Sequence, residues 1–168
     1  MKKLISLSML LLAFSFVFIS CSRDDDEGSS SSNYIQVDNG SKLAVSSAAV
    51  MGFKASDASE ENFYTITLIN TAGTSTKMAS LALYFPYNQS MDGTYTLTST
   101  SRKLDDWLSS YAETTGSAMQ SYNDLTQGTC TVKRNSTDNF TVSFSFKTAS
   151  GKTVNGEFSG KASVQESN

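Results

Sequence analysis

Apolar and polar side chains alternate one by one through much of this chain. The clearest stretch is 140–147, where every second residue is apolar: Phe140, Val142, Phe144 and Phe146. The residues between them are Thr, Ser and Lys. A period of two places the apolar side chains on one face of a β-strand, whereas a helix would scatter them around its axis. The pattern therefore predicts a strand with one buried face.

The same alternation continues on both sides of this stretch. Downstream, 153–164 carries an apolar row that two glycines complete: Val154, Phe158, Ala162 and Val164. Upstream, Cys130 and Val132 face one way within 129–133. Gly151 suits a tight turn in the first connection, and the polar residues 135–139 supply the second turn. We expect a three-stranded antiparallel meander at this end of the chain.

The earlier part of the chain carries further short strand patterns. They cover 34–37, 43–53, 62–70, 77–85 and 94–99, and Asn-Gly, Ala-Gly and Asp-Gly pairs separate several of them. Gly and Asn favour turns because they adopt positive φ at low cost. About eight short antiparallel strands in one domain predict an all-β fold, either a β-sandwich or a β-barrel-like domain.

One segment departs from the strand pattern. Leu104, Trp107, Leu108 and Tyr111 recur at intervals of three and four residues. That spacing predicts a short helix or an ordered loop over 103–112, which would cross one mouth or edge of the sheet. The following residues, 113–127, are polar and without a clear pattern, so we expect a long mobile loop there.

The N-terminus has the form of an export signal. Lys2 and Lys3 precede an apolar run over 4–20, which is shorter than a stable membrane span needs and is followed by acidic residues. We expect a signal peptide over 1–20; a retained anchor helix is the alternative. The sequence Phe18-Ile19-Ser20-Cys21 then resembles the lipobox of bacterial lipoproteins, with Phe18 where Leu is usual. The resemblance implies that Cys21 is acylated and anchors the chain to the outer membrane.

The residues after Cys21 bear on the membrane face to which the anchored protein is sorted. Ser22, then Asp24, Asp25, Asp26 and Glu27, resemble the export signal that sends Bacteroidetes lipoproteins to the outer face of the outer membrane. A solvated acidic linker is the alternative, and a weak calcium site lacks the spacing of an EF-hand loop. We interpret 21–33 as the lipidated Cys and a flexible tether, and 34–168 as a single domain.

The body of the chain is similar to small uncharacterised lipoprotein domains of Bacteroidetes. The similarity lies in 92–97, 127–129 and 151–160, which repeat a theme of glycine, strand and turn. It implies an all-β fold and no known activity. No functional residue follows from it.

The amino-acid composition excludes several classes of catalysis and binding. The 168 residues include no His, and 13 Lys and Arg stand against 16 Asp and Glu. Loss of Lys2 and Lys3 with the signal peptide would leave 11 basic residues. A chain without imidazole has no Ser-His-Asp triad and no His-ligated metal, and a chain without a basic cluster is a poor nucleic-acid binder. We predict no enzyme, no cofactor, no metal site and no nucleic-acid partner.

The remaining candidates for chemistry are weak. Cys130 lies beside Val132 in an apolar row, so we expect a buried structural thiol rather than a nucleophile. The adjacent acidic pairs at 60–61 and 105–106 do not face each other across a substrate, as the two carboxylates of a glycosidase must. We interpret both pairs as surface charge.

Aromatic residues are the stronger candidates for a binding site. Trp107, Tyr111 and Tyr122 form either a stacking platform for a ligand or, as helical spacing favours, a plug in which Trp107 and Leu108 close one end of the fold. We therefore predict a lipid-anchored surface lipoprotein that binds a glycan, a peptide or a protein partner. An inhibitor or immunity-type protein is the alternative; a carboxylate-only enzyme and a structural subunit remain open.

Overall fold

The structure, a computed structural model, describes residues 33–167, and within that range it contains thirteen strands and no helix. The strands of the N-terminal half are β1 (Tyr34–Val37), β2 (Leu43–Ala44), β3 (Ser47–Phe53), β4 (Glu61–Ala72), β5 (Ser75–Pro86), β6 (Gly93–Thr96) and β7 (Lys103–Leu104). Those of the C-terminal half are β8 (Ser110–Thr115), β9 (Ala118–Tyr122), β10 (Leu125–Arg134), β11 (Asn139–Thr148), β12 (Thr153–Lys161) and β13 (Ser163–Ser167).

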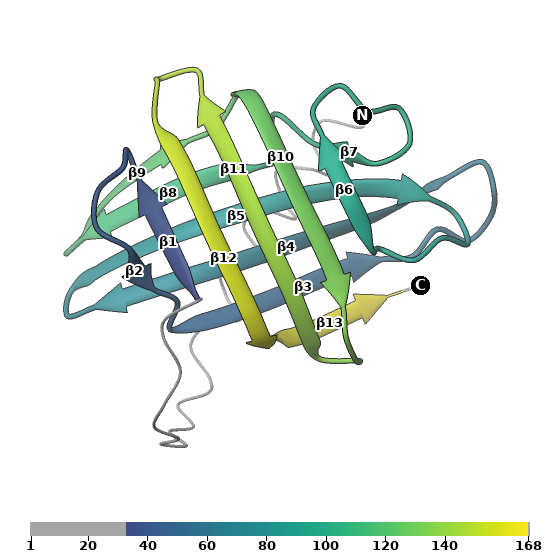
Figure 1. Cartoon of the computed structure of the whole chain (residues 1–168), viewed down its shortest axis with the longest axis horizontal. Coiled ribbons are helices and arrows are strands. Elements are labelled where there is room, and N and C mark those ends of the chain that lie inside the picture. The colour runs from purple at the N-terminus through teal and green to yellow at the C-terminus, as the bar shows by residue number, and fades with distance from the viewer. Residues whose placement is uncertain (1–32, 168) are drawn as a thin grey trace. The chain divides into compact units, whose positions relative to one another are not determined.

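All of these strands belong to one mixed sheet that curls into a half-barrel (Figure 1). The hydrogen-bonded order is β13-β3-β4-β5-β7-β6-β10-β11-β12-β1-β2. Outside this order, β8 pairs with β5 on one side and with β9 on the other. Figure 1 shows β10, β11 and β12 in front of β3, β4 and β5, with the two groups crossing at a steep angle. Two pairs are parallel, β13 with β3 and β6 with β7.

The core lies between these two groups of strands. The row on 140–147 is buried as the alternation predicts, and so are the inward rows of β4 and β5. The predicted meander is confirmed, because β11 pairs antiparallel with both β10 and β12. Gly156 on β12 leaves room for the Phe144 ring of the neighbouring strand β11, since a Cβ there would lie 2.4 Å from Cε1 of that ring.

The predicted helix over 103–112 is wrong. Its ends are in β7 and β8, and a turn lies between them. The Asp105 carboxylate accepts hydrogen bonds from the backbone N–H groups of Trp107 (3.0 Å) and Leu108 (2.8 Å). The turn also binds the edge of β5, since Asp105 N–H donates to the Ala82 carbonyl (2.8 Å) and Ala82 N–H to Ser109 Oγ (2.9 Å). Apart from one helix-type bond, from Ser109 N–H to the Asp105 carbonyl (3.3 Å), the Asp105 carboxylate and the bonds to β5 hold this turn.

Several other expectations need correction. The number of strands is higher than eight, and the sheet is not wholly antiparallel. Of the two architectures expected, the half-barrel corresponds to the barrel-like one, and a sandwich is not shown in the described part of the chain. The segment 113–127 is not a loop, because it contains β9, part of β8 and the start of β10. The row over 153–164 is interrupted at Ala162, whose N–H donates to the Asp138 carbonyl (2.8 Å), and the chain then joins β3 as β13.

Candidate functional site

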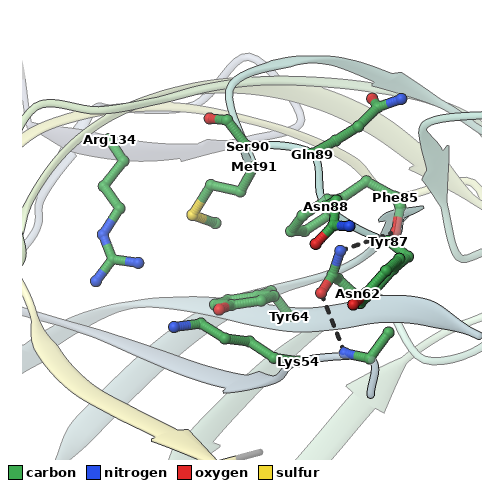
Figure 2. Close-up of a pocket in the computed structure, with 11 residues that line it drawn as sticks. Lys54, Asn62, Tyr64, Phe85, Tyr87, Asn88, Gln89, Ser90, Met91 and Arg134 are labelled. Atoms are coloured by element: carbon green, nitrogen blue, oxygen red, sulfur yellow. Dashed lines mark hydrogen bonds between the residues drawn. The ribbon is translucent and has the colours of Figure 1, made fainter. Parts of the chain in front are cut away.

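A pocket of about 340 Å³ lies where β3, β5 and β10 end and β4 begins (Figure 2). The strands supply its floor and one wall, and the loop after β5 supplies the rest. Its lining consists of Lys54, Ala55, Asn62, Tyr64, Phe85, Tyr87, Asn88, Gln89, Ser90, Met91 and Arg134. The pocket therefore combines aromatic rings, amides and two cations.

Hydrogen bonds within the protein hold the pocket walls in place. The buried Asn62 side chain donates to the Pro86 carbonyl (2.8 Å) and accepts from the Ala55 N–H (3.1 Å), which fixes β4 to the chain on either side. Arg102 braces the loop from behind by donating to the carbonyl of Ser90 (3.0 Å) and to Oε1 of Gln89 (3.2 Å). These bonds hold the strand ends and the loop after β5 in one arrangement around the pocket.

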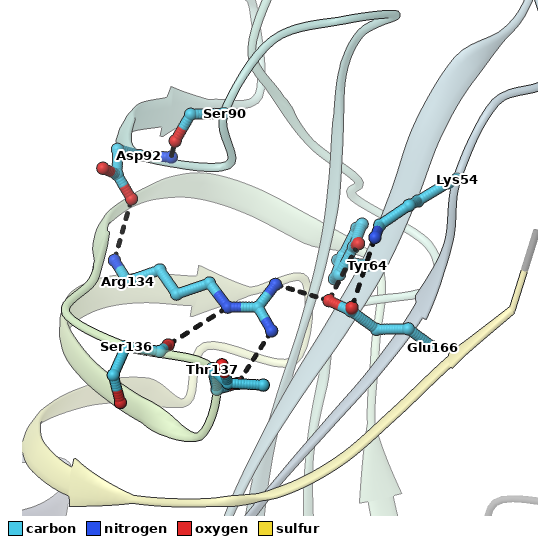
Figure 3. Close-up of polar contacts among 8 residues, drawn as sticks. All are labelled: Lys54, Tyr64, Ser90, Asp92, Arg134, Ser136, Thr137 and Glu166. Carbon is cyan, nitrogen blue, oxygen red and sulfur yellow. Dashed lines mark hydrogen bonds and ion pairs between the residues drawn. The ribbon is translucent and has the colours of Figure 1, made fainter.

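A charged network lies at one side of the pocket (Figure 3). The Glu166 carboxylate, on β13, pairs with Arg134 Nη1 at 2.5 Å and with Lys54 Nζ at 3.4 Å, and it accepts a hydrogen bond from the Tyr64 hydroxyl at 3.0 Å. Arg134 also donates to the carbonyls of Ser136 (3.2 Å) and Thr137 (2.7 Å). These bonds fix the guanidinium group in one orientation.

The network sets the ionisation of its members. Burial alone would raise the pKa of Glu166, but the hydrogen bonds from Arg134 and Tyr64 and the charges of Arg134 and Lys54 outweigh it and lower that pKa. Burial, followed by the bond to Glu166 and its charge, raises the pKa of Tyr64 to about 12. At neutral pH the carboxylate is therefore ionised and the phenol is protonated.

Gly52 makes room for the Tyr64 ring. A Cβ at this position would lie 2.2 Å from Cε1 of Tyr64, so any side chain on β3 there would push the ring out of place. The ring lies on the pocket floor and its hydroxyl reaches Glu166. Gly52 is therefore a positioning residue for the charged network.

The structure separates the aromatic residues that the sequence suggested. Tyr111 and Tyr122 stack at 5.9 Å between ring centroids, and both hydroxyls donate to Glu113. Tyr111 is fully buried, and burial raises its pKa, so it has no face for a ligand. Trp107 lies in the turn after β7 and is 51% exposed. Trp107 therefore does not plug the core, whereas Leu104 on β7 and Tyr111 on β8 are fully buried in it.

Cys130, the predicted buried thiol, is not among the residues that line the pocket. Cys130 is buried as expected, and burial raises the pKa of its thiol. Among residues 33–167 no group of three or more Cys, Asp or Glu side chains is placed to hold a metal ion. The lipidation residue Cys21 and the export residues 22–27 lie outside the described residues.

Sequence reasoning missed the pocket, although a signal for it exists. Arg134 continues the inward row of Cys130 and Val132, and Asn62 precedes the inward row of β4. Polar residues at the ends of apolar rows are rare without a partner, because a buried charge or amide needs hydrogen bonds. The loop after β5 carries no such pattern.

Comparisons with known protein families, with characterised proteins and with solved structures find no match to this chain. Its function must therefore be argued from the geometry of the domain and from the sequence. Within the described residues, no helix is both long enough and apolar enough to span a membrane.

Proposed function

We propose that this chain is a lipid-anchored outer-membrane lipoprotein, displayed at the cell surface, that binds a small polar ligand in the pocket without chemical change. The observation that carries the binding role is the pocket itself, whose lining combines aromatic side chains, amide groups and two cations. Small-molecule sites combine these features, and their volumes begin near 300 Å³, so a ligand of one or two rings fits.

The anchoring rests on the sequence. Cys21 follows an apolar run at the place where lipoproteins carry their acylated Cys, and an acidic block follows it. Each buried methylene of an acyl chain contributes about 0.8 kcal/mol, so two or three chains hold a protein on a membrane permanently. The tether over 21–33 would leave the domain free to meet ligands outside the cell.

The anchoring is tested with two variants of the tagged full-length protein. We expect Cys21→Ser to remove the lipid, as seen by mass, and to release the protein from the membrane. Neutralising Asp24, Asp25, Asp26 and Glu27 should protect the domain from protease added to intact cells, whereas wild type is digested. A lipid-free variant that stays bound contradicts the anchor, and an unchanged digestion pattern contradicts the export signal.

A second function is favoured by a different observation. Trp107 (51% exposed) and Met119 (49% exposed), on the turn after β7 and on β9, are the large apolar side chains most open to solvent in the described domain. Exposed aromatic and Met side chains are common anchors in protein interfaces. They would suit an inhibitor or immunity-type protein that covers an enzyme. A complex with one enzyme that is lost with Trp107→Ala would support this function over ligand binding in the pocket.

A further inference from the structure

The pocket is chemically divided. Figure 2 shows Lys54 and Arg134 at one side and Asn88 and Tyr87 at the other, with the Tyr64 ring and Met91 between them. A ligand that spans the pocket would thus meet cations at one end, an apolar floor in its middle and hydrogen-bonding groups at its other end. This order of groups restricts the chemistry of the ligand.

The cationic side of the pocket presents two cations and no carboxylate among the residues that line the cavity. Lys54 and Arg134 line the cavity, whereas Glu166, which pairs with both, is not among the lining residues. Both charged residues of the lining are therefore cations, in a chain whose formal net charge is −3. Cations on the lining favour an anionic group on the ligand.

The same side also has unused hydrogen-bond donors. An Arg side chain has about five N–H donors. Within the described residues, Arg134 donates to Glu166, Ser136 and Thr137 through one N–H each. Two N–H groups are left over, and Lys54 has donors beyond its contact with Glu166. Charge-assisted bonds to a carboxylate are about twice as strong as neutral ones.

We propose that the pocket binds a sugar unit that carries a carboxylate. This inference rests on the proposed binding function and names its ligand class. The carboxylate lies against Lys54 and Arg134, the sugar ring crosses the middle of the pocket, and the hydroxyl groups bond to Asn88 and Tyr87. The amide of Asn88 and the phenol of Tyr87 suit the hydroxyl groups of a sugar.

The test compares two probes that differ at one group. Methyl β-D-glucuronide carries a carboxylate where methyl β-D-glucoside carries a hydroxymethyl group. Titration calorimetry on the full-length protein in detergent should show the glucuronide binding at least about tenfold more tightly than the glucoside, because only the glucuronide contacts the cations. Acetate, which lacks the ring, should bind far more weakly than the glucuronide.

Matched variants locate the effect. Lys54→Gln removes one cation that is half exposed, so the fold tolerates it, and glucuronide affinity should fall about tenfold. Lys133→Gln removes the same charge from an exposed position next to Arg134 and should leave that affinity unchanged. Melting curves of both variants confirm that they are folded.

Three results would overturn the proposal. The first is equal affinity for the two glycosides, and the second is an equal effect of Lys54→Gln and Lys133→Gln on glucuronide affinity. The third is no detectable binding at a glucuronide concentration of about 10 mM, because a dissociation constant above that value means negligible affinity. If the glucoside binds as well as the glucuronide, the pocket remains a binding site and only the carboxylate is wrong. The anchoring test on Cys21 is independent of all these outcomes.

Discussion

At the scale of single residues, Glu166 joins three residues that line the pocket. Its carboxylate meets an ammonium, a guanidinium and a phenol that come from three different parts of the chain. Removing one partner of such a group leaves the others without their acceptor, which costs more than the bond itself. Glu166 therefore affects stability as well as the electrostatics of the pocket.

We expect Glu166→Gln to lower the free energy of unfolding by about 1–2 kcal/mol at pH 7. The folded state lowers the pKa of Glu166, so its stabilisation is fully present above the unfolded pKa of about 4.3 and is lost as the pH falls through the folded pKa. The difference between variant and wild type in urea unfolding should thus shrink in acid. The exposed Glu61→Gln serves as control, and a difference independent of pH would contradict this role.

Gly156 tests how closely the strands pack. A Cβ there would lie 2.4 Å from the Phe144 ring and 2.8 Å from the Tyr34 carbonyl oxygen, and the backbone oxygen cannot rotate away. Gly156→Ala should destabilise the domain by about 2–3 kcal/mol in urea unfolding. Gly73→Asn, at φ 60° with open space around it, should cost less than about 1 kcal/mol. Similar losses in both variants would mean that the packing is looser than described.

At the scale of elements, the alternation of apolar and polar residues predicts most of the strands. It does not predict the contacts with distant strands that decide where a strand ends. The alternating rows of β4, β5 and β11 were readable because one face of each strand is buried. The segment 103–112 was misread because its helical spacing came from two short strands and a turn, and its hydrogen bonds go to β5, which is distant in sequence. Arg134 could have been noticed as a charge in an apolar row, but its partner on β13 could not.

The turn after β7 and the strand β8 that follows it carry two aromatic residues in different surroundings, Trp107 and Tyr111. We expect Tyr111→Ala to destabilise the domain by about 3–5 kcal/mol, because this ring is fully buried and its loss leaves a cavity. Trp107→Ala removes a side chain that is 51% exposed and should cost about 1 kcal/mol or less. Thermal unfolding of both variants measures the difference. A large loss with Trp107→Ala would restore the plug that the sequence suggested.

At the scale of the whole domain, the last strand serves both the sheet and the pocket. β13 pairs parallel with β3 along Ser163–Ser167 and carries Glu166 into the charged network. Removal of residues 163–168 should lower the free energy of unfolding by about 3 kcal/mol or more, because it removes a hydrogen-bonded strand as well as the carboxylate. Denaturation beside Glu166→Gln tests this, and equal losses would show that the pairing of β13 contributes nothing.

The pairing of N-terminal with C-terminal strands also determines when, during synthesis of the chain, the sheet can be completed. β1 finds its partner only when β12 has been made, and β3 gains β13 only at the last described residues. Chains whose native contacts join distant parts of the sequence fold slowly. Slow folding keeps a new polypeptide unfolded while it passes through a translocation channel, as the export that we propose for this chain requires.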